Sequence, residues 1–134
     1  MISIRASDDL NPVHLKELVK KAGDSFIYTY DFGDGWRHEV ILEEIIYPEE
    51  TPPLVACCVV GRRACPPEDV GGIGGYAEFI EIIEDPHNME RFEKLEWAGG
   101  DFDADSFDIR GVNLRLLELT ESLFELEAVG QQQF

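Results

Sequence analysis

The run Tyr28-Thr-Tyr-Asp-Phe-Gly-Asp-Gly-Trp-Arg-His38 constrains this chain more than any other feature, because it predicts a β-hairpin and the face that the hairpin buries. A three-residue loop over 33–35 needs a positive φ, which Gly35 supplies. The predicted cross-strand pairs on one face are Phe32 with Trp36, Tyr30 with His38, Tyr28 with Val40, and Phe26 with Leu42. Charged side chains dominate the other face, so the pattern predicts antiparallel strands over about 25–32 and 36–46 with one buried face.

A two-residue turn at Asp34-Gly35 is the alternative connection between the strands. It would set the aromatic side chains opposite Arg37, Glu39 and Glu43, which mixes the two faces of the hairpin. The three-residue loop is therefore the predicted one.

The composition fits a single domain over residues 1–134 and favours some partners over others. A hydrophobic share of 44% supports a packed core despite a net charge of -17. Residues 76–134 carry -11 of that charge, from 15 acidic and four basic side chains. Because nucleic-acid binding depends on Lys and Arg at the phosphates, this charge disfavours direct DNA or RNA binding and suits a basic protein partner.

Hydropathy and cysteine content predict the compartment. No segment has the length and hydropathy of a signal peptide or a membrane span, so we expect a cytoplasmic protein that does not contact a membrane. An odd number of cysteines without a secretory signal indicates reduced thiols. The cysteines are Cys57, Cys58 and Cys65.

Apolar spacing and capping residues predict four helices in addition to the hairpin. The helices are one that begins at Asn11-Pro12 and ends near Gly23, one over 76–84, one over roughly 87–96, and one over the a/d seam from Ile109 to Leu126. The segment Leu54–Val60 is predicted as a strand or an extended segment. We therefore expect an α+β fold, in which the antiparallel β-hairpin and one or two further strands pack an aromatic face against helices.

The segment 62–75 combines a Pro-Pro pair with four glycines, which indicates a shaped loop and not a flexible spacer. Trp36 needs cover at the end of the sheet, and the proline pair is apolar and already rigid. We expect the part of this loop over 66–75 to pack near the hairpin turn, with Asp69 within side-chain reach of residues 34–38.

Four motifs resemble those of a known family. The motifs are Tyr28-x-Tyr-Asp-Phe-Gly-Asp-Gly-Trp-x-His38, Cys58-x-x-Gly61, Cys65-Pro-Pro-Glu-Asp-x-Gly-Gly-x-x-Gly-Tyr76 and Leu95-x-Trp-x-Gly-Gly-x-Phe-Asp103. Over roughly residues 15–120 the chain resembles the family named for open reading frame three of the Agrobacterium root-inducing plasmid (pRi), whose members are also labelled TnpR-type passengers of insertion elements. The resemblance implies a prokaryotic α+β domain linked to mobile elements and without an established biochemical activity.

The chain departs from the family pattern in two places. About two dozen residues precede the hairpin, so the domain is shortened at its N-terminus relative to the family. Val70 stands where members often carry a third cysteine, which weakens any metal site inferred from the family. The TnpR label suggests a serine recombinase, which needs a nucleophilic serine among arginines and a basic module. This sequence offers no arginine cluster beyond Arg62-Arg63.

Acidic residues and a histidine in two turn regions are the candidate catalytic residues. Asp34, His38, Glu68 and Asp69 could surround a water nucleophile or a hard cation. In the structural interpretation, Asp34 forms the turn and His38 is a core residue bonded to a neighbour, while Glu68 and Asp69 cap backbone amides. The rarity of functional sites favours the structural interpretation.

The candidate ligands for zinc or another divalent metal are Cys58, Cys65, His38 and Asp69. Neither cysteine belongs to a Cys-x-x-Cys pair, and the adjacent Cys57 would point to the opposite face of a strand. Buried reduced cysteines are the favoured interpretation, and no cofactor is expected.

The sequence therefore predicts a non-enzymatic interaction or accessory module of the family it resembles. The alternative is a small metal-dependent hydrolase with its site between the hairpin turn and the Pro-Pro-Glu-Asp loop. The length of the a/d seam and an uncovered hairpin edge also predict a homodimer, formed through the last helix or the hairpin edge.

Overall fold

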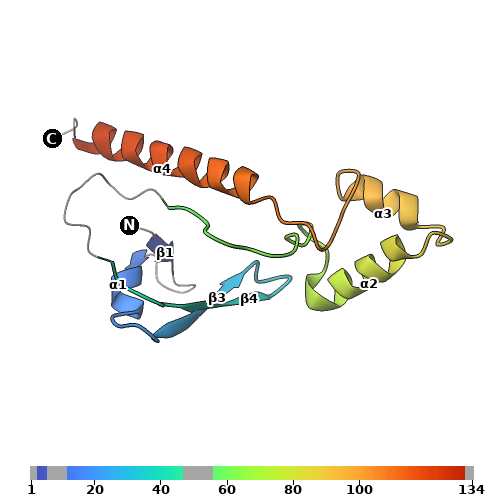
Figure 1. Cartoon of the computed structure of the whole chain (residues 1–134), viewed down its shortest axis with the longest axis horizontal. Helices are drawn as coiled ribbons and strands as arrows, with labels where there is room; N and C mark the ends of the chain where they lie inside the picture. Colours follow the sequence, from blue (N-terminus) through green and yellow to red (C-terminus); the bar gives the residue numbers. More distant parts are fainter. Residues whose placement is uncertain (1–2, 6–11, 47–55, 132–134) are drawn as a thin grey trace. The chain divides into compact units, whose positions relative to one another are not determined.

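The computed structural model describes residues 3–5, 12–46 and 56–131 (Figure 1). The elements in chain order are β1 (Ser3–Arg5), β2 (Pro12–His14), α1 (Leu15–Leu18), β3 (Ser25–Tyr30), β4 (Trp36–Ile41), α2 (Gly72–Glu84), α3 (Arg91–Trp97) and α4 (Ile109–Gln131). Strands precede the three longer helices, and the fold is the predicted α+β fold.

The predicted hairpin is present, with β3 and β4 antiparallel, but its predicted register is wrong by two residues. The observed pairs on the aromatic face are Tyr30 with Trp36, Tyr28 with His38, and Phe26 with Val40. The side chains within β3 and β4 keep their predicted faces, because a shift of two residues preserves the alternation of a strand. The predicted pairing of Phe32 with Trp36 is wrong, since Phe32 lies in the loop and is 78% exposed. The three-residue loop is replaced by a five-residue loop over 31–35.

Asp31 explains the longer loop. Its φ of 55° places it in the left-handed region, where a strand cannot continue. Its Oδ1 accepts the backbone N–H groups of Gly33 at 2.9 Å and Asp34 at 3.3 Å, and its carbonyl accepts the N–H of Gly35 at 2.6 Å. The Asp31 side chain therefore ends β3 at Tyr30, and Gly35 has the predicted positive φ, at 71°.

The N-terminal region differs from the predicted helix. Pro12 lies in β2, which pairs with β1, and α1 is a single turn that begins only at Leu15. Gly23, with φ of 92°, does not cap a helix but donates its N–H to the carbonyl of Leu42 at 2.8 Å. Asn11 lies outside the described residues. The further strands thus form a sheet of their own in the described part of the chain.

The helix α2 carries the best-buried side chains of the described structure. Phe79, Ile82 and Ile83 on α2 are buried, and Phe79 is only 2% exposed. The helix α2 begins four residues before the predicted start at 76, and α3 begins four residues after its predicted start at 87. The Nε of Arg91 donates to the carbonyl of Ile83 at 2.8 Å, which ties the start of α3 to the end of α2.

The segment Leu54–Val60, predicted as a strand or an extended segment, falls partly outside the described residues, which resume at 56. Residues 56–60 are not a strand in the structure. The last helix, α4, begins at Ile109 as predicted. Within the described ranges, no helix combines the length and hydropathy needed to cross a lipid bilayer.

Close contacts divide the chain into two compact units. The first comprises residues 1–49 and 69–79, and the second comprises residues 50–68 and 80–134. The hairpin and the start of α2 belong to the first unit, while α3 and α4 belong to the second.

Candidate functional site

Within the first unit, the hairpin turn contacts the glycine-rich loop that starts α2. The Oδ2 of Asp34 accepts the N–H of Gly71 at 3.1 Å. Gly72 has φ of 67°, and a Cβ atom at this position would collide with the carbonyl oxygen of Asp34. We call this set of three residues the turn–loop contact. It confirms that the loop packs at the hairpin turn, and it requires glycine at position 72.

The aromatic face of the hairpin meets α2 beside the turn–loop contact. The rings of Trp36 and Tyr76 lie edge to face, with centroids 6.3 Å apart and planes at 75°. Tyr76 in turn stacks on the buried Phe79 at 6.4 Å. Tyr76 thus supplies cover for Trp36, and the predicted cover by the proline pair stays a prediction.

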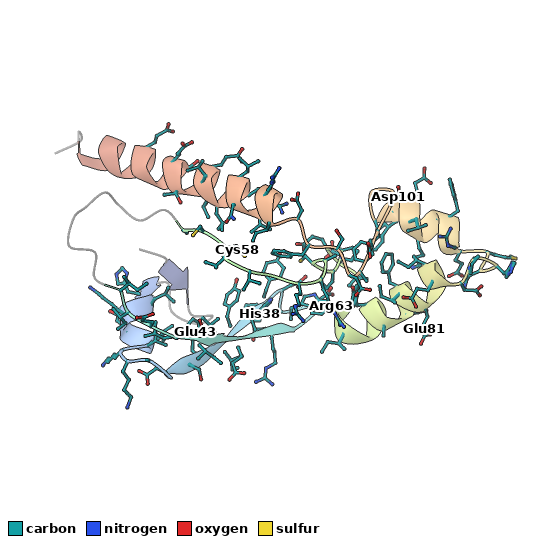
Figure 2. All side chains as sticks on the ribbon, viewed as in Figure 1. His38, Glu43, Cys58, Arg63, Glu81 and Asp101 are labelled. Carbon is teal, nitrogen blue, oxygen red and sulfur yellow. The ribbon has the colours of Figure 1, made fainter. Side chains whose placement is uncertain are left out.

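The imidazole of His38 lies on β4, as Figure 2 shows, and is exposed. Its Nδ1 is 3.3 Å from the carbonyl oxygen of Tyr28, and its ring centroid is 5.7 Å from the ring of Tyr28. The neighbour of His38 is therefore Tyr28 and not the predicted Tyr30, which follows from the corrected register. The predicted hydrogen bond to a neighbour is present, but the predicted core position of His38 is wrong, because the side chain is exposed.

The remaining candidate acids lie on the connection to α2. Asp69 is exposed and has φ of 58°, while Glu68 is exposed and belongs to the second unit. In this region, the structure brings Asp34 to the backbone of Gly71, two residues beyond Asp69. A catalytic role for these residues and His38 stays a prediction.

The candidate metal ligands come from both units. His38 and Asp69 belong to the first unit, and Cys58 and Cys65 to the second. Cys58 is a free, half-buried thiol whose Sγ donates to the carbonyl of Val60 at 3.4 Å. Cys57 and Cys65 are free and exposed, so the prediction of buried cysteines is wrong for these two. Across residues 3–5, 12–46 and 56–131, no three side chains of His, Cys, Asp or Glu are arranged to share a metal ion.

A depression of about 380 Å³ lies in the second unit, where residues 63–65 run beside the connection from α3 to α4. Its lining includes Phe107, Arg115 and Arg63, and the N–H of Ala64 donates to the carbonyl of Ala104 at 3.0 Å. Gly61 packs against the Phe107 ring so closely that a Cβ atom would collide with it. The motif glycine of Cys58-x-x-Gly61 is therefore a packing residue.

A family model described as plasmid pRiA4b ORF-3-like protein matches residues 4–111, which is most of the chain and includes both sides of the turn–loop contact. The chain belongs to the plasmid pRiA4b ORF-3-like family. This membership confirms the resemblance to open reading frame three of the pRi plasmid. Three residues of the matched motifs, Trp36, Gly71 and Tyr76, form the contact between the hairpin and the start of α2.

Two relatives of this pRiA4b ORF-3-like chain illustrate the family. The first is the uncharacterized protein y4hQ of Sinorhizobium fredii (strain NBRC 101917 / NGR234), which is 39% identical over 107 residues, or 78% of this chain and 54% of the relative. The second is the crystal structure of the protein of unknown function MM3350 from Methanosarcina mazei Go1, with a TM-score of 0.58 and 40% identity over 65% of this chain and 48% of that chain. The chain spans about half the length of each relative.

One structural residue of this family member was missed from the sequence. The Oδ1 of Asn113 on α4 accepts the N–H of Cys58 at 2.6 Å, and its Nδ2 donates to the carbonyl of Cys58 at 3.0 Å. The available signal was an amide side chain between the apolar residues Val112 and Leu114 on the last helix. Such a position indicates a side chain that satisfies a nearby backbone.

Proposed function

We propose that this plasmid pRiA4b ORF-3-like chain is a non-enzymatic interaction module that binds a basic protein. The supporting observation is the charge that the second unit exposes. Glutamates recur at every third residue on α2 and across α3, and all of them are exposed. They are Glu81, Glu84, Glu90, Glu93 and Glu96, of which Glu81 is labelled in Figure 2. Complementary charge steers association between proteins and selects the partner.

The acids of the first unit support a structural role. The carboxylate of Asp34 is engaged by the N–H of Gly71, and that of Asp31 by two N–H groups of its own loop. A carboxylate that orders a turn in this way is accounted for without catalysis. The family name refers to a plasmid reading frame, so we extend the proposal to a cytoplasmic accessory protein of mobile elements.

Binding to defined probes tests this proposal. Fluorescence anisotropy at low salt would compare a labelled lysine-rich peptide with a labelled short DNA duplex. We expect saturable binding of the peptide that weakens as salt is added, and no binding of the duplex. Tighter binding of the duplex than of the peptide would contradict the proposal.

A pair of charge-matched variants locates the binding surface. The test variant carries Glu81→Gln, Glu84→Gln and Glu93→Gln, and the control carries Glu39→Gln, Glu43→Gln and Glu44→Gln on and after β4. We expect the test variant to bind the peptide about tenfold more weakly, because three exposed ion pairs contribute about 0.5 kcal/mol each, and the control to change by less than about threefold. Equal losses would mean that net charge acts without a defined surface.

A further inference from the structure

One side of α4 carries four residues whose charges are complementary to those of a second, antiparallel copy. Arg110, Leu114, Leu117 and Glu121 are spaced by four, three and four residues, which places them on one face of the helix. We call this face the α4 stripe. This face lies on the opposite side of the helix from the a/d seam, and it is distinct from the acidic residues of α2 and α3.

The leucines of the α4 stripe are uncovered within the described structure. The side chains of Leu114 and Leu117 are 62% and 40% exposed. Together with Ile109, Arg110 and Asn113 they line an open depression of about 480 Å³. Two exposed leucines one helical turn apart form an apolar contact site, and such a site favours a partner that covers it.

Charge flanks the leucines with opposite sign at the two ends. Arg110 and Glu121 are both exposed, and neither has an ion-pair partner in the part of the chain that the structure describes. Eleven residues of helix separate them by about 16 Å, so they cannot pair with each other. Each is available to a charge on another molecule.

We propose that two copies of this chain pair through the α4 stripe in antiparallel orientation. Arg110 and Glu121 lie equally far from the midpoint between Leu114 and Leu117, so a two-fold axis at that midpoint sets Arg110 opposite the partner's Glu121 at both ends. The same axis sets Leu114 opposite the partner's Leu117. A parallel copy would instead set arginine against arginine and glutamate against glutamate. Self-complementarity of this kind is what an isologous contact requires.

The size of the contact sets its strength. The α4 stripe is only about 16 Å long and lies on a single helix. It therefore buries much less than the roughly 800 Å² that each partner contributes to a standard stable interface. The dimer is therefore weak, and its population depends on protein concentration. Repulsion between the two acidic chains weakens it further at low salt.

Sedimentation velocity of the full chain over a concentration series at moderate salt tests this pairing. We expect the wild type to dimerise, and the Arg110→Glu and Glu121→Arg variants each to dimerise at least tenfold more weakly, because each sets like charges opposite at both ends. An equimolar mixture of the two variants should restore dimerisation, since every opposed pair is then an arginine with a glutamate. Matched controls are Lys20→Glu and Glu43→Arg, which change the net charge equally in the first unit and should leave dimerisation within about twofold of the wild type.

Several results would overturn the antiparallel pairing. One is a wild type that stays monomeric at millimolar concentration. Another is a pair of single variants that dimerise as well as the wild type, which is the result expected of parallel helices. A third is equal weakening by the controls, which would mean that net charge alone governs association. Circular dichroism spectra like that of the wild type would show that the exposed substitutions leave α4 intact.

Discussion

At the scale of single residues, Asn113 does for Cys58 what a neighbouring strand does in a sheet. Its amide accepts one N–H and donates to one carbonyl of the same residue, at 2.6 Å and 3.0 Å. Cys58 is half-buried, and a half-buried backbone group that loses its partner costs more than a typical hydrogen bond contributes. The irregular segment 56–60 thereby gains fixed partners without belonging to a sheet.

Removing this amide should destabilise the protein. For Asn113→Ala we expect a loss of about 2 kcal/mol in the free energy of unfolding, reduced by about 0.5 kcal/mol because alanine favours the helix. Asn88→Ala removes an exposed acceptor of the Glu90 N–H and should cost less than about 1 kcal/mol. Urea denaturation measures both variants. A loss for Asn113→Ala no greater than that for Asn88→Ala would show that the bonds to Cys58 contribute little.

Asp34 offers a second test at this scale, because its carboxylate is either structural or catalytic. We expect Asp34→Ala to lower the free energy of unfolding by about 1 kcal/mol, since Gly71 loses an acceptor, and Asp34→Asn to cost less than about 0.5 kcal/mol, since the amide oxygen still accepts. Thermal denaturation followed by circular dichroism would compare them. Equal stability of wild type and alanine variant would argue that the bond to Gly71 is not formed in solution.

At the scale of elements, the glycines at the start of α2 have different structural roles. Gly72 combines a positive φ with a Cβ position that the Asp34 carbonyl would occupy, whereas Gly74 has open space around its Cβ position. One glycine is therefore required by the turn–loop contact, and the other only lowers helix propensity.

The two alanine variants should shift stability in opposite directions. Gly72→Ala should cost at least about 2 kcal/mol, from backbone strain and the displaced turn. Gly74→Ala should raise stability by up to about 1 kcal/mol, because alanine is the better helix former. The midpoints of urea unfolding give both values. Tolerance of alanine at 72 would mean that the hairpin turn does not approach this residue.

The elements also define what the sequence could predict. The alternation of Tyr28, Tyr30, Trp36 and His38 was sufficient for the faces of the hairpin. It could not decide the register, because pairings that differ by two residues give the same faces, and the decision rests on the hydrogen bonds of Asp31. The early start of α2 was missed for a related reason: glycine disfavours helices, and contact with the turn outweighs that preference here.

The sequence predicted the position of the candidate site but not the hydrogen bonds that form there. Proximity of the hairpin turn to the glycine-rich loop followed from Trp36 and its need for cover. The bond from Gly71 to Asp34 depends on a turn whose shape was not predicted. The pair of Asn113 and Cys58, separated by 55 positions, left no pattern of spacing that sequence reasoning could use.

At the scale of the whole molecule, the dominant quantity is the net charge of -17 on 134 residues. Like charges at this density repel one another in the folded state more than in the expanded unfolded chain. Exposed pairs offset little of this repulsion. Arg63 and Asp105, for example, are 4.0 Å apart and have side chains that are 81% and 90% exposed.

Salt should therefore stabilise the folded protein. On raising sodium chloride from low to moderate concentration we expect a gain of about 1 kcal/mol, or roughly 4 °C in Tm for a chain of this size. Differential scanning calorimetry measures the shift. The variant Glu39→Lys, Glu43→Lys should respond less to salt, because it carries less repulsion. A Tm that falls with salt would mean that attractive ion pairs dominate the surface.

The turn–loop contact also has a consequence for the order of folding events. The hairpin closes a loop of five residues, whereas the bond between Asp34 and Gly71 joins residues 37 positions apart. Closing the longer segment costs more chain entropy, so the hairpin can form in microseconds and the contact with α2 later. Stopped-flow measurements should then find that Asp34→Ala mainly accelerates unfolding and leaves the refolding rate nearly unchanged. The hairpin turn would thus be formed before α2 packs against it.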